Sequence, residues 1–307
     1  MFTLLAKSVI ADGGAVFGAA FDRSDWHVAH VCVENDAGLD RLRGSKYVQS
    51  EIGKAFDEVV RLLEKGRKVL FSGTPCQVAG LRRMLESSGV NAMDNLLFVD
   101  IVCHAVPSPL AWERYLGKRC QDIGCAQGGL SGINSIAFRN KACGWKRYLV
   151  SLGFANGVEH RAEFSDDTFM RGFLSELYNR PACHNCQFRN LSSGADLTIG
   201  DYWGVASRYP DMDDDSGTSL VLVNSAKGAR AFTAIGDQLT MRESDFAHAV
   251  ESNPAIVRPF PAHKNRAMFF ANSDVEDFDN LVGRLLKISP YARFRSAAAQ
   301  FLRKVVR

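Results

Sequence analysis

Hydrophobic and polar residues follow two different periods in the first half of the chain. The apolar runs at residues 68–73 and 95–103 are short and continuous, as in strands that are buried on both faces of a sheet. Residues 52–66 and 75–89 instead have the character of amphipathic helices, each of which ends at a glycine. This strand–helix order predicts an α/β fold with a parallel or mixed sheet flanked by helices. Further helices are predicted at 3–12 and 107–119, and further strands at 15–22 and 27–35.

The pattern changes near residue 133. Short alternating segments follow one another around Gly and Asn turns, which is typical of β-hairpins, at residues 133–140, 146–157 and 159–165. Residues 166–179 then have a helical pattern. We therefore expect an N-terminal α/β domain over residues 1–130 and a hairpin-rich α+β domain over 131–307. A single interlocked unit is the alternative, because the later motifs are expected to return to the first half of the chain.

Composition places the chain among ordinary soluble globular proteins. It has 307 residues, of which 46% are hydrophobic and 23% charged, and no apolar run approaches the roughly 20 residues of a membrane-spanning helix. Lys7 and Asp12 interrupt the segment where a signal peptide would need its apolar stretch. We therefore expect a cytoplasmic protein, in which the eight cysteines are thiols or metal ligands and not a disulfide framework.

Positive charge is concentrated at the C-terminal end. Residues 284–307 contain seven Lys or Arg and no Asp or Glu, so the net charge of +3 leaves the preceding residues at −4. This pattern favours a terminal helix with a solvated basic face, and peripheral contact with an anionic membrane or a partner is the alternative. Basic and aromatic residues are not interleaved elsewhere, which argues against nucleic acid as a partner.

Four cysteines stand out by their position. Cys76 follows a buried strand across a Gly-Thr-Pro turn, and Cys103 ends the next buried strand. Ligands collect at the carboxyl ends of strands in open parallel sheets, so both thiols are predicted to reach one site. Cys183 and Cys186 form a Cys-x-x-Cys pair in a Gly- and aromatic-rich stretch and are candidates for two further ligands.

The residue types leave the kind of site open. A Cys-x-x-Cys pair suits a tetrahedral zinc site, a reversible dithiol or an iron–sulfur cluster. Structural zinc sites usually combine two tight pairs of ligands, whereas here two single cysteines accompany one pair. The spacing therefore favours a [4Fe–4S] cluster over zinc.

Glycine-containing turns offer places for an anionic cofactor. The turn at Ser72, Gly73 and Thr74 leads into a helix, whose N-terminus attracts phosphate. No Walker or dinucleotide-binding glycine motif is present. Gln77, in the first turn of that helix, is a further candidate. The remaining candidates for cofactor binding are polar or aromatic residues in three other segments: Ser45, Lys46, Gln49, His104, Asp201 and Trp203. By residue chemistry alone, Lys46 suits a phosphate and Trp203 suits a planar ring, while solvent exposure and core packing are the simpler interpretations.

Five sequence blocks taken together resemble one known family. "LRGSKYVQSEIG", "VLFSGTPCQVAGL", "VDIVCHAVPSP", "RPACHNCQF" and "LTIGDYWG" occur in the order found in the coenzyme F420 hydrogenase/dehydrogenase beta-subunit family. The resemblance extends from about residue 2 to at least residue 225. It implies an iron–sulfur flavoprotein oxidoreductase that passes electrons between a [4Fe–4S] cluster, FAD and a deazaflavin or another acceptor.

The resemblance also implies roles for individual residues. It implies that Cys76, Cys103, Cys183 and Cys186 hold the cluster, and that the turns around Lys46, Gly73–Thr74 and Asp201 line the flavin site. The implied partners are a small-molecule acceptor and an electron-transfer protein, either ferredoxin-like or a hydrogenase or dehydrogenase subunit. A ferredoxin-like segment with four further cysteines, which many relatives carry, is absent from this sequence. A second cluster would then belong to a partner or would not be used.

Two other functions are weighed against this one. A non-catalytic, zinc-stabilised binding module would use the same cysteines without redox chemistry. A transferase linked to polysaccharide modification would use the phosphate-friendly turns. The sequence has no obvious acid/base carboxylate pair, and the stretch "DMDDDSG" is better interpreted as a solvated acidic loop than as an Asp-x-Asp metal motif.

Overall fold

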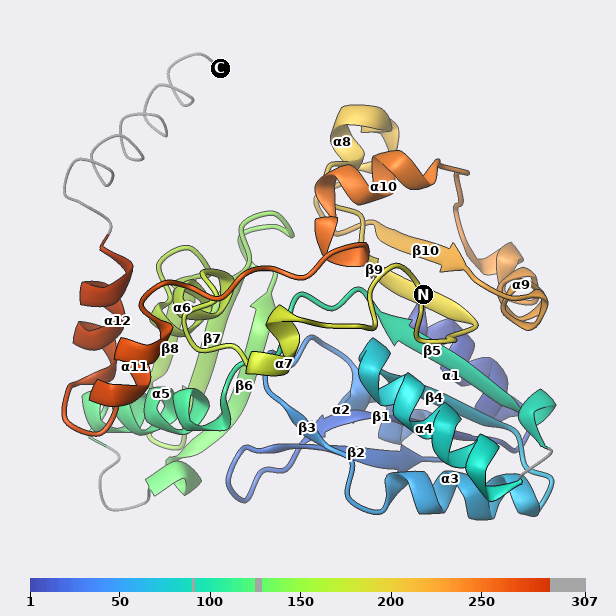
Figure 1. The fold of residues 1–307 in the computed structure, drawn as a ribbon, viewed down its shortest axis with the longest axis horizontal. Helices are drawn as coiled ribbons and strands as arrows, with labels where there is room; N and C mark the ends of the chain where they lie inside the picture. Colours follow the sequence, from blue (N-terminus) through green and yellow to red (C-terminus); the bar gives the residue numbers. More distant parts are fainter. Residues whose placement is uncertain (90–91, 125–128, 288–307) are drawn as a thin grey trace.

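The computed structural model describes residues 1–89, 92–124 and 129–287, which form two β-sheets and the helices that cover them (Figure 1). In spatial order the large sheet contains β10 (Ser219–Val223), β9 (Leu197–Asp201), β5 (Leu96–Ile101), β4 (Val69–Gly73), β1 (Ala15–Phe21), β2 (Val28–Val33) and β3 (Ser50–Glu51). The small sheet contains β6 (Ile133–Asn140), β7 (Leu149–Phe154) and β8 (Glu159–Glu163).

The large sheet is mixed, with a parallel centre. Strand β4 is parallel to β1 and β5, and β5 is parallel to β9. The outer strands β10 and β2 run antiparallel to β9 and β1. The small sheet is antiparallel throughout. The predicted fold class is confirmed: an α/β unit with a mixed sheet is followed by a hairpin-rich part.

Alternating residues of the central strands build two hydrophobic layers, because successive side chains of a strand point to opposite faces. Phe71 and Phe98 lie in the layer covered by α3 and α4. Leu70 and Val99 lie in the opposite layer, covered by α1, α2 and α9. These five helices are α1 (Phe2–Ala11), α2 (Asp36–Leu42), α3 (Ala55–Glu64), α4 (Pro75–Ser88) and α9 (Ala226–Thr233).

A third, aromatic core lies between the small sheet and its helices. Trp112, Phe138 and Phe169 are buried there, and Trp26 joins them from the turn between β1 and β2. The indole N–H of Trp112 donates to the backbone oxygen of Trp26 at 2.9 Å. The helices around this core are α5 (Pro109–Asp122), α6 (Thr168–Leu174), α11 (Arg266–Asn272) and α12 (Phe278–Leu286). Three shorter helices are α7 (Pro181–His184), α8 (Val205–Arg208) and α10 (Phe246–Ser252).

Most of the predicted elements of the first half are present within one or two residues, with one additional helix and one correction. Helix α2, which precedes the polar stretch before α3, has no counterpart among the predicted elements. The helix predicted over 166–179 is shorter, since α6 ends at Leu174 and Glu176 has a left-handed backbone (φ 61°). A left-handed residue cannot continue a right-handed helix.

The chain crosses between the two sheets more than once. Strands β9 and β10 come after the small sheet in sequence, but they complete the large sheet beside β5. The domain boundary near residue 130 stays a prediction, and this strand order agrees with the interlocked alternative. No helix among the described residues is both long and apolar enough to cross a lipid bilayer. The predicted basic terminal helix lies mostly beyond residue 287, outside the described residues.

Candidate functional site

Cys76 lies in the first turn of α4, at the carboxyl end of β4. Thr74 is the N-cap and Pro75 the first helical residue, a position where the missing N–H of proline costs nothing. The backbone N–H and the hydroxyl of Thr74 donate to the side-chain oxygen of Gln77, at 2.9 and 3.1 Å. The thiol of Cys76 is 3.2 Å from the Thr74 hydroxyl. A capped, proline-started turn therefore presents this exposed thiol above the sheet.

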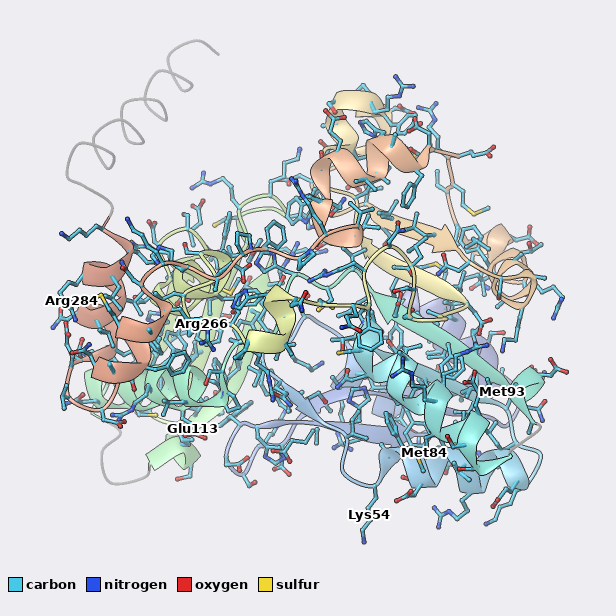
Figure 2. The ribbon with its side chains drawn as sticks, in the orientation of Figure 1. Lys54, Met84, Met93, Glu113, Arg266 and Arg284 are labelled. Carbon is cyan, nitrogen blue, oxygen red and sulfur yellow. The ribbon has the colours of Figure 1, made fainter. Side chains whose placement is uncertain are left out.

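Cys103 and the Cys-x-x-Cys pair meet because two distant segments pair as a short antiparallel bridge. The N–H of Ser108 donates to Tyr178 and the N–H of Arg180 donates to Val106, both at 2.9 Å. The bridge itself joins Pro107 to Asn179. The segment before it carries Cys103, and the segment after it carries Cys183 in α7 and Cys186. Next to the bridge, Arg266 (labelled in Figure 2) donates from Nε to the backbone oxygen of Asn179 at 2.9 Å.

The four thiols are linked electrostatically. The pKa of Cys103 is raised to about 12, chiefly by burial and to a smaller extent by negative charge on Cys76, Cys183 and Cys186. Burial likewise raises the pKa of Cys183, and Cys76 and Cys186 add to the increase. Because such interactions weaken with distance, Cys103 and Cys183 each lie in the same region as the other cysteines that act on them. The four predicted cysteines therefore lie in one region of the fold, and their role as metal ligands stays a prediction.

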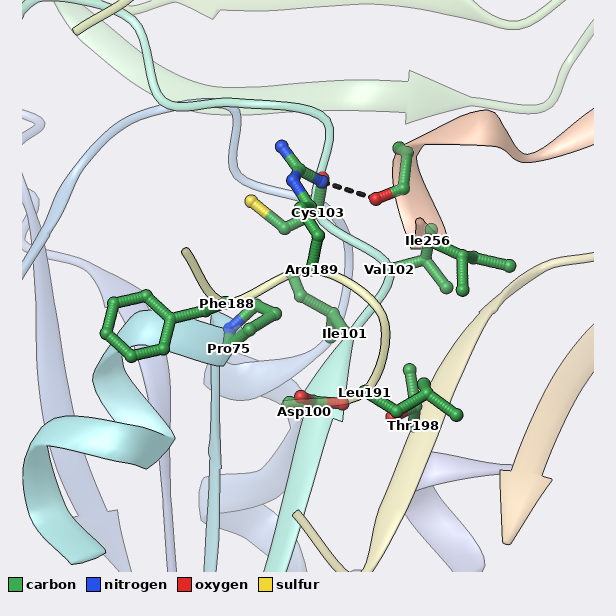
Figure 3. Close-up of a pocket in the computed structure, with 11 residues that line it drawn as sticks. Pro75, Asp100, Ile101, Val102, Cys103, Phe188, Arg189, Leu191, Thr198 and Ile256 are labelled. Carbon is green, nitrogen blue, oxygen red and sulfur yellow. Dashed lines mark hydrogen bonds between the residues drawn. The ribbon is translucent and has the colours of Figure 1, made fainter. Parts of the chain in front are cut away.

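One positively charged side chain accompanies the thiols, and sequence reasoning did not find it. Arg189 is 8% exposed and donates to the backbone oxygens of Cys103 and His104, the latter at 2.7 Å. Its charge lowers the pKa of both Cys103 and Cys183, against the effect of burial. Figure 3 shows the guanidinium beside Cys103 and bonded to a third segment at Ala255. Its place three residues after the Cys-x-x-Cys pair is the only sequence signal that pointed to it.

The space beside Cys103 and Arg189 is a small pocket. Its empty volume, including the part open to solvent, is about 270 Å³, and Pro75, Phe188 and Ile256 also line it. Small-molecule sites usually enclose about 300–1,000 Å³, so a dinucleotide such as FAD does not fit here. Among the described residues, no three His, Cys, Asp or Glu side chains form a group that could hold a metal ion as they stand.

The predicted cofactor residues of the loop before β3 are partly enclosed. The ammonium of Lys46 donates to the backbone oxygens of Arg43 and Gly44, at 2.8 and 3.2 Å, and burial lowers its pKa to about 8. The side-chain oxygen of Gln49 is buried without a hydrogen-bond partner in the described part of the structure. Ser45 is exposed. The loop thus contains a cation and a free acceptor, both of which suit a polar ligand.

The predicted residues of the β4–α4 turn have structural partners. The backbone oxygen of Ser72 bonds the Nε2 atom of His30 at 3.0 Å. Both polar ends of the Gln77 side chain are used, because its amide nitrogen donates to Ser50 at 3.1 Å and its oxygen caps α4. A Cβ on Gly73 would come within 3.1 Å of Phe71 and Gln77, so this position favours glycine. These residues support the turn that carries Cys76.

His104 lies against a buried carboxylate. Its Nε2 atom is 2.6 Å from Glu176, and its ring packs on Phe260 with a centroid distance of 4.6 Å. The same carboxylate is 3.7 Å from His184, the residue after Cys183. Glu176 was not among the predicted site residues. It lies in a sequence with a helical pattern, which gave no sign that its carboxylate would contact His104 and His184.

Asp201 and Trp203 belong to an aromatic and charged cluster between the two sheets. Arg139 pairs with Asp201 at 2.8 Å, and the indole N–H of Trp145 donates to the same carboxylate at 3.1 Å. Trp203 stacks on Trp145 with a centroid distance of 4.5 Å and an interplanar angle of 8°. The guanidinium of Arg139 is also 3.2 Å from the hydroxyl of Tyr47, in the Lys46 loop. One face of Trp203 is therefore occupied by core packing.

Comparison with known proteins identifies relatives for this arrangement. Residues 66–247 match the family model for the C terminus of the coenzyme F420 hydrogenase/dehydrogenase beta subunit. Among solved structures, a chain of the xenon-derivatized F420-reducing [NiFe] hydrogenase complex from Methanosarcina barkeri is similar, with a TM-score of 0.51 and 15% identity. The match covers 83% of this chain and 82% of the other, and at this identity it shows a common fold. No curated protein matches the chain.

Proposed function

Because this chain belongs to the coenzyme F420 hydrogenase/dehydrogenase beta-subunit family, we propose that it is an iron–sulfur flavoprotein oxidoreductase with one [4Fe–4S] cluster. The observation that carries the proposal is the placement of Cys76 and Cys103 after the paired strands β4 and β5, together with the Pro107–Asn179 bridge, which joins the segment of Cys103 to the segment of Cys183 and Cys186. The family supports a redox role of the beta-subunit type. The cluster, the flavin and the acceptor are the parts that the proposal adds.

The donor set fits a cluster better than a single metal ion. A zinc ion with Zn–S distances of about 2.3 Å requires all four sulfurs to crowd around one point. In a [4Fe–4S] cluster each thiolate binds a different iron, so the sulfurs are spread around a larger object. Two single cysteines on separate strand ends and one Cys-x-x-Cys pair suit the larger object.

In this proposal the chain holds the cluster with Cys76, Cys103, Cys183 and Cys186, and the cluster supplies one-electron transfer when bound. The capped turn at Thr74 orients the first of these thiols, and the bridge between Pro107 and Asn179 brings the second to the last two. The positive charge of Arg189 offsets the negative charge of the thiolates.

We propose that FAD, which supplies a two-electron step when bound, lies near the loop of Lys46 and Gln49. With its pKa lowered to about 8, Lys46 is still mostly protonated at pH 7 and can pair with a phosphate. The unpartnered oxygen of Gln49 offers an acceptor in the same loop. Deazaflavin or another small molecule would be the acceptor, and a further subunit or a ferredoxin-like protein would be the electron-transfer partner.

Anaerobic purification tests the cluster directly. We expect about four iron and four sulfide per chain, a broad absorbance near about 400 nm, and bleaching on reduction with dithionite. Cys76→Ser should lower the iron content by at least about half, because the cluster loses one of its ligands. The matched control is Cys32→Ser, a half-buried thiol in β2 that the proposal leaves outside the site.

The same preparation tests the flavin and separates the alternatives. We expect the denatured protein to release FAD, detected by its fluorescence, in an amount up to one FAD per chain. One zinc per chain, with no iron and no flavin binding on titration with FAD, would contradict the redox proposal and favour the zinc-stabilised module.

A further inference from the structure

Arg189 is a buried cation for which the structure describes no carboxylate partner. None of the ion pairs among the described residues includes it, and its side chain lies in the wall of the pocket beside Cys103. Burying an unpaired charge costs several kcal/mol unless a countercharge or strong hydrogen bonds compensate. Hydrogen bonds to three backbone oxygens offset part of this cost, and a nearby anion would offset the rest.

We propose that Arg189 is a positioning residue that raises the reduction potential of the cluster by placing a fixed positive charge next to it. This inference rests on the proposed function. Reduction adds one electron to a cluster that four thiolates already make negative, so an adjacent cation stabilises the reduced form more than the oxidised form.

The guanidinium is held in place by groups from two segments. It donates to the oxygens of Cys103 and His104 on the strand end after β5, and to Ala255 at 2.6 Å on the segment after α10. Its Nε atom is buried and has no hydrogen-bond partner among the described residues. A planar fork with several donors can bridge such carbonyls, which the single ammonium of lysine cannot do in the same geometry.

The backbone that follows Arg189 has an unusual conformation. Asn190 and Leu191 are consecutive non-glycine residues with left-handed backbone angles, φ 57° and 59°. Each such residue costs on the order of 1 kcal/mol or more and persists only where its surroundings enforce it. Here the N–H of Asn190 donates to Ile256 at 2.6 Å, beside the oxygen that Arg189 itself binds. The strained turn therefore fixes the arginine against the same segment.

The guanidinium binds the backbone oxygen of Cys103, so its charge lies next to one of the proposed cluster ligands. A neighbouring charge commonly shifts a protonation equilibrium by about tenfold or more, and we expect an effect of the same size on the reduction equilibrium of the cluster. For a one-electron couple, a tenfold change in the equilibrium constant corresponds to about 59 mV.

The test is a redox titration of the anaerobically purified protein, followed by absorbance with dithionite as the reductant. Arg189→Gln is expected to retain iron and to have a potential at least about 59 mV lower than the wild type, a tenfold change. Arg189→Lys keeps the charge and should remain closer to the wild type. The matched control is Arg180→Gln, which removes an exposed arginine from the N-cap of α7, where solvent screens the charge.

Each outcome bears on the inference. An Arg189→Gln protein that holds iron at the wild-type potential overturns it, as does an equal shift in Arg180→Gln. If Arg189→Gln loses its iron, the iron content of two further variants is compared. Iron that is retained by Arg189→Lys but lost from Arg189→Met supports a required positive charge. Iron lost from all three variants would assign the residue to hydrogen bonding alone and overturn the inference. A wild-type protein without a cluster would instead refute the proposed function.

Discussion

At the scale of single residues, buried polar side chains hold the turns around the cysteines. His30 is 7% exposed and joins three strands, because its ring nitrogens bond the Ser50 hydroxyl at 2.7 Å and the Ser72 oxygen at 3.0 Å. Its ring also stacks on Phe71 with a centroid distance of 5.1 Å. The contacts with Phe71 and Ser72 tie β2 to the strand that leads to Cys76. A neutral histidine satisfies them, with Nε2–H as the donor to Ser72.

This buried histidine predicts a specific dependence of stability on pH. Burial lowers the pKa of His30 to about 4, below the value of about 6.5 in the unfolded chain. The unfolded state therefore binds the extra proton first, and the contribution of His30 is present above pH 6.5 and lost as the pH falls towards 4. Between pH 7 and pH 5 the wild type should lose about 2 kcal/mol more unfolding free energy than His30→Gln. Urea denaturation at both pH values measures this difference.

His27 provides the control for that experiment. It is a more exposed histidine whose pKa is raised by Asp25, so its contribution has the opposite sign and is lost as the pH rises. His27→Gln should therefore not remove the acid-side loss of stability. If His30→Gln and the wild type had the same slope between pH 7 and pH 5, the buried neutral state assigned to His30 would be wrong.

At the scale of elements, β9 approaches the end of β5 very closely. Gly200, the glycine before Asp201, faces Val102, and a Cβ at this position would lie 2.8 Å from a methyl group of that valine. The N–H of Val102 donates to Ile199 at 2.8 Å, so the valine cannot move away without breaking the pairing. This contact explains a glycine in the strand and links it to Cys103, the next residue after Val102.

Gly200→Ala is therefore expected to destabilise the protein by about 1–3 kcal/mol, the usual cost of overpacking. The added methyl group should also displace Val102 and lower the iron content of the purified protein. The control is Gly117→Ala in α5, where a Cβ would meet nothing within 4 Å and where alanine favours the helix by about 0.5–1 kcal/mol. Urea denaturation and iron analysis of both variants check the prediction, and a Gly200→Ala protein as stable as the control would contradict it.

At the scale of the whole molecule, the two sheets share their sequence segments. The aromatic core of the small sheet includes Trp26 from the β1–β2 turn, and the large sheet is completed by β9 and β10 from the second half of the chain. Removing the second half would expose the long edge of β5, which is buried in the intact sheet. Neither half has a complete core of its own.

We therefore expect one cooperative unfolding transition for the chain. Far-ultraviolet circular dichroism and tryptophan fluorescence should give the same urea midpoint, because Trp26 and Trp112 belong to one core and the backbone signal comes from both sheets. A fragment of residues 1–130 should be insoluble or unfolded. Two separate transitions, or a folded fragment, would support the predicted boundary near residue 130.

The sequence alone was sufficient for most of the local architecture, and it also provides the prediction of the four cysteines as ligands. Strands such as β4 and β5 and helices such as α3 follow from periodicity, which depends only on neighbouring residues, and the strand-end positions of Cys76 and Cys103 predicted their common edge. The same four cysteines were also implied by the five sequence blocks that resemble the family. The predicted flavin contacts were less informative, since Gln77 and Trp203 are engaged in capping and stacking.

Only the tertiary structure decided how the distant pieces meet. Three features join residues more than 65 positions apart: the pairing of Val106–Ser108 with Tyr178–Arg180, the return of β9 beside β5, and the position of Arg189 beside Cys103. Such contacts depend on chain crossing and on the closure of long loops, and a periodic pattern contains no information about either. A buried arginine and an exposed one look the same in a sequence, because the difference lies in what the rest of the chain places around them.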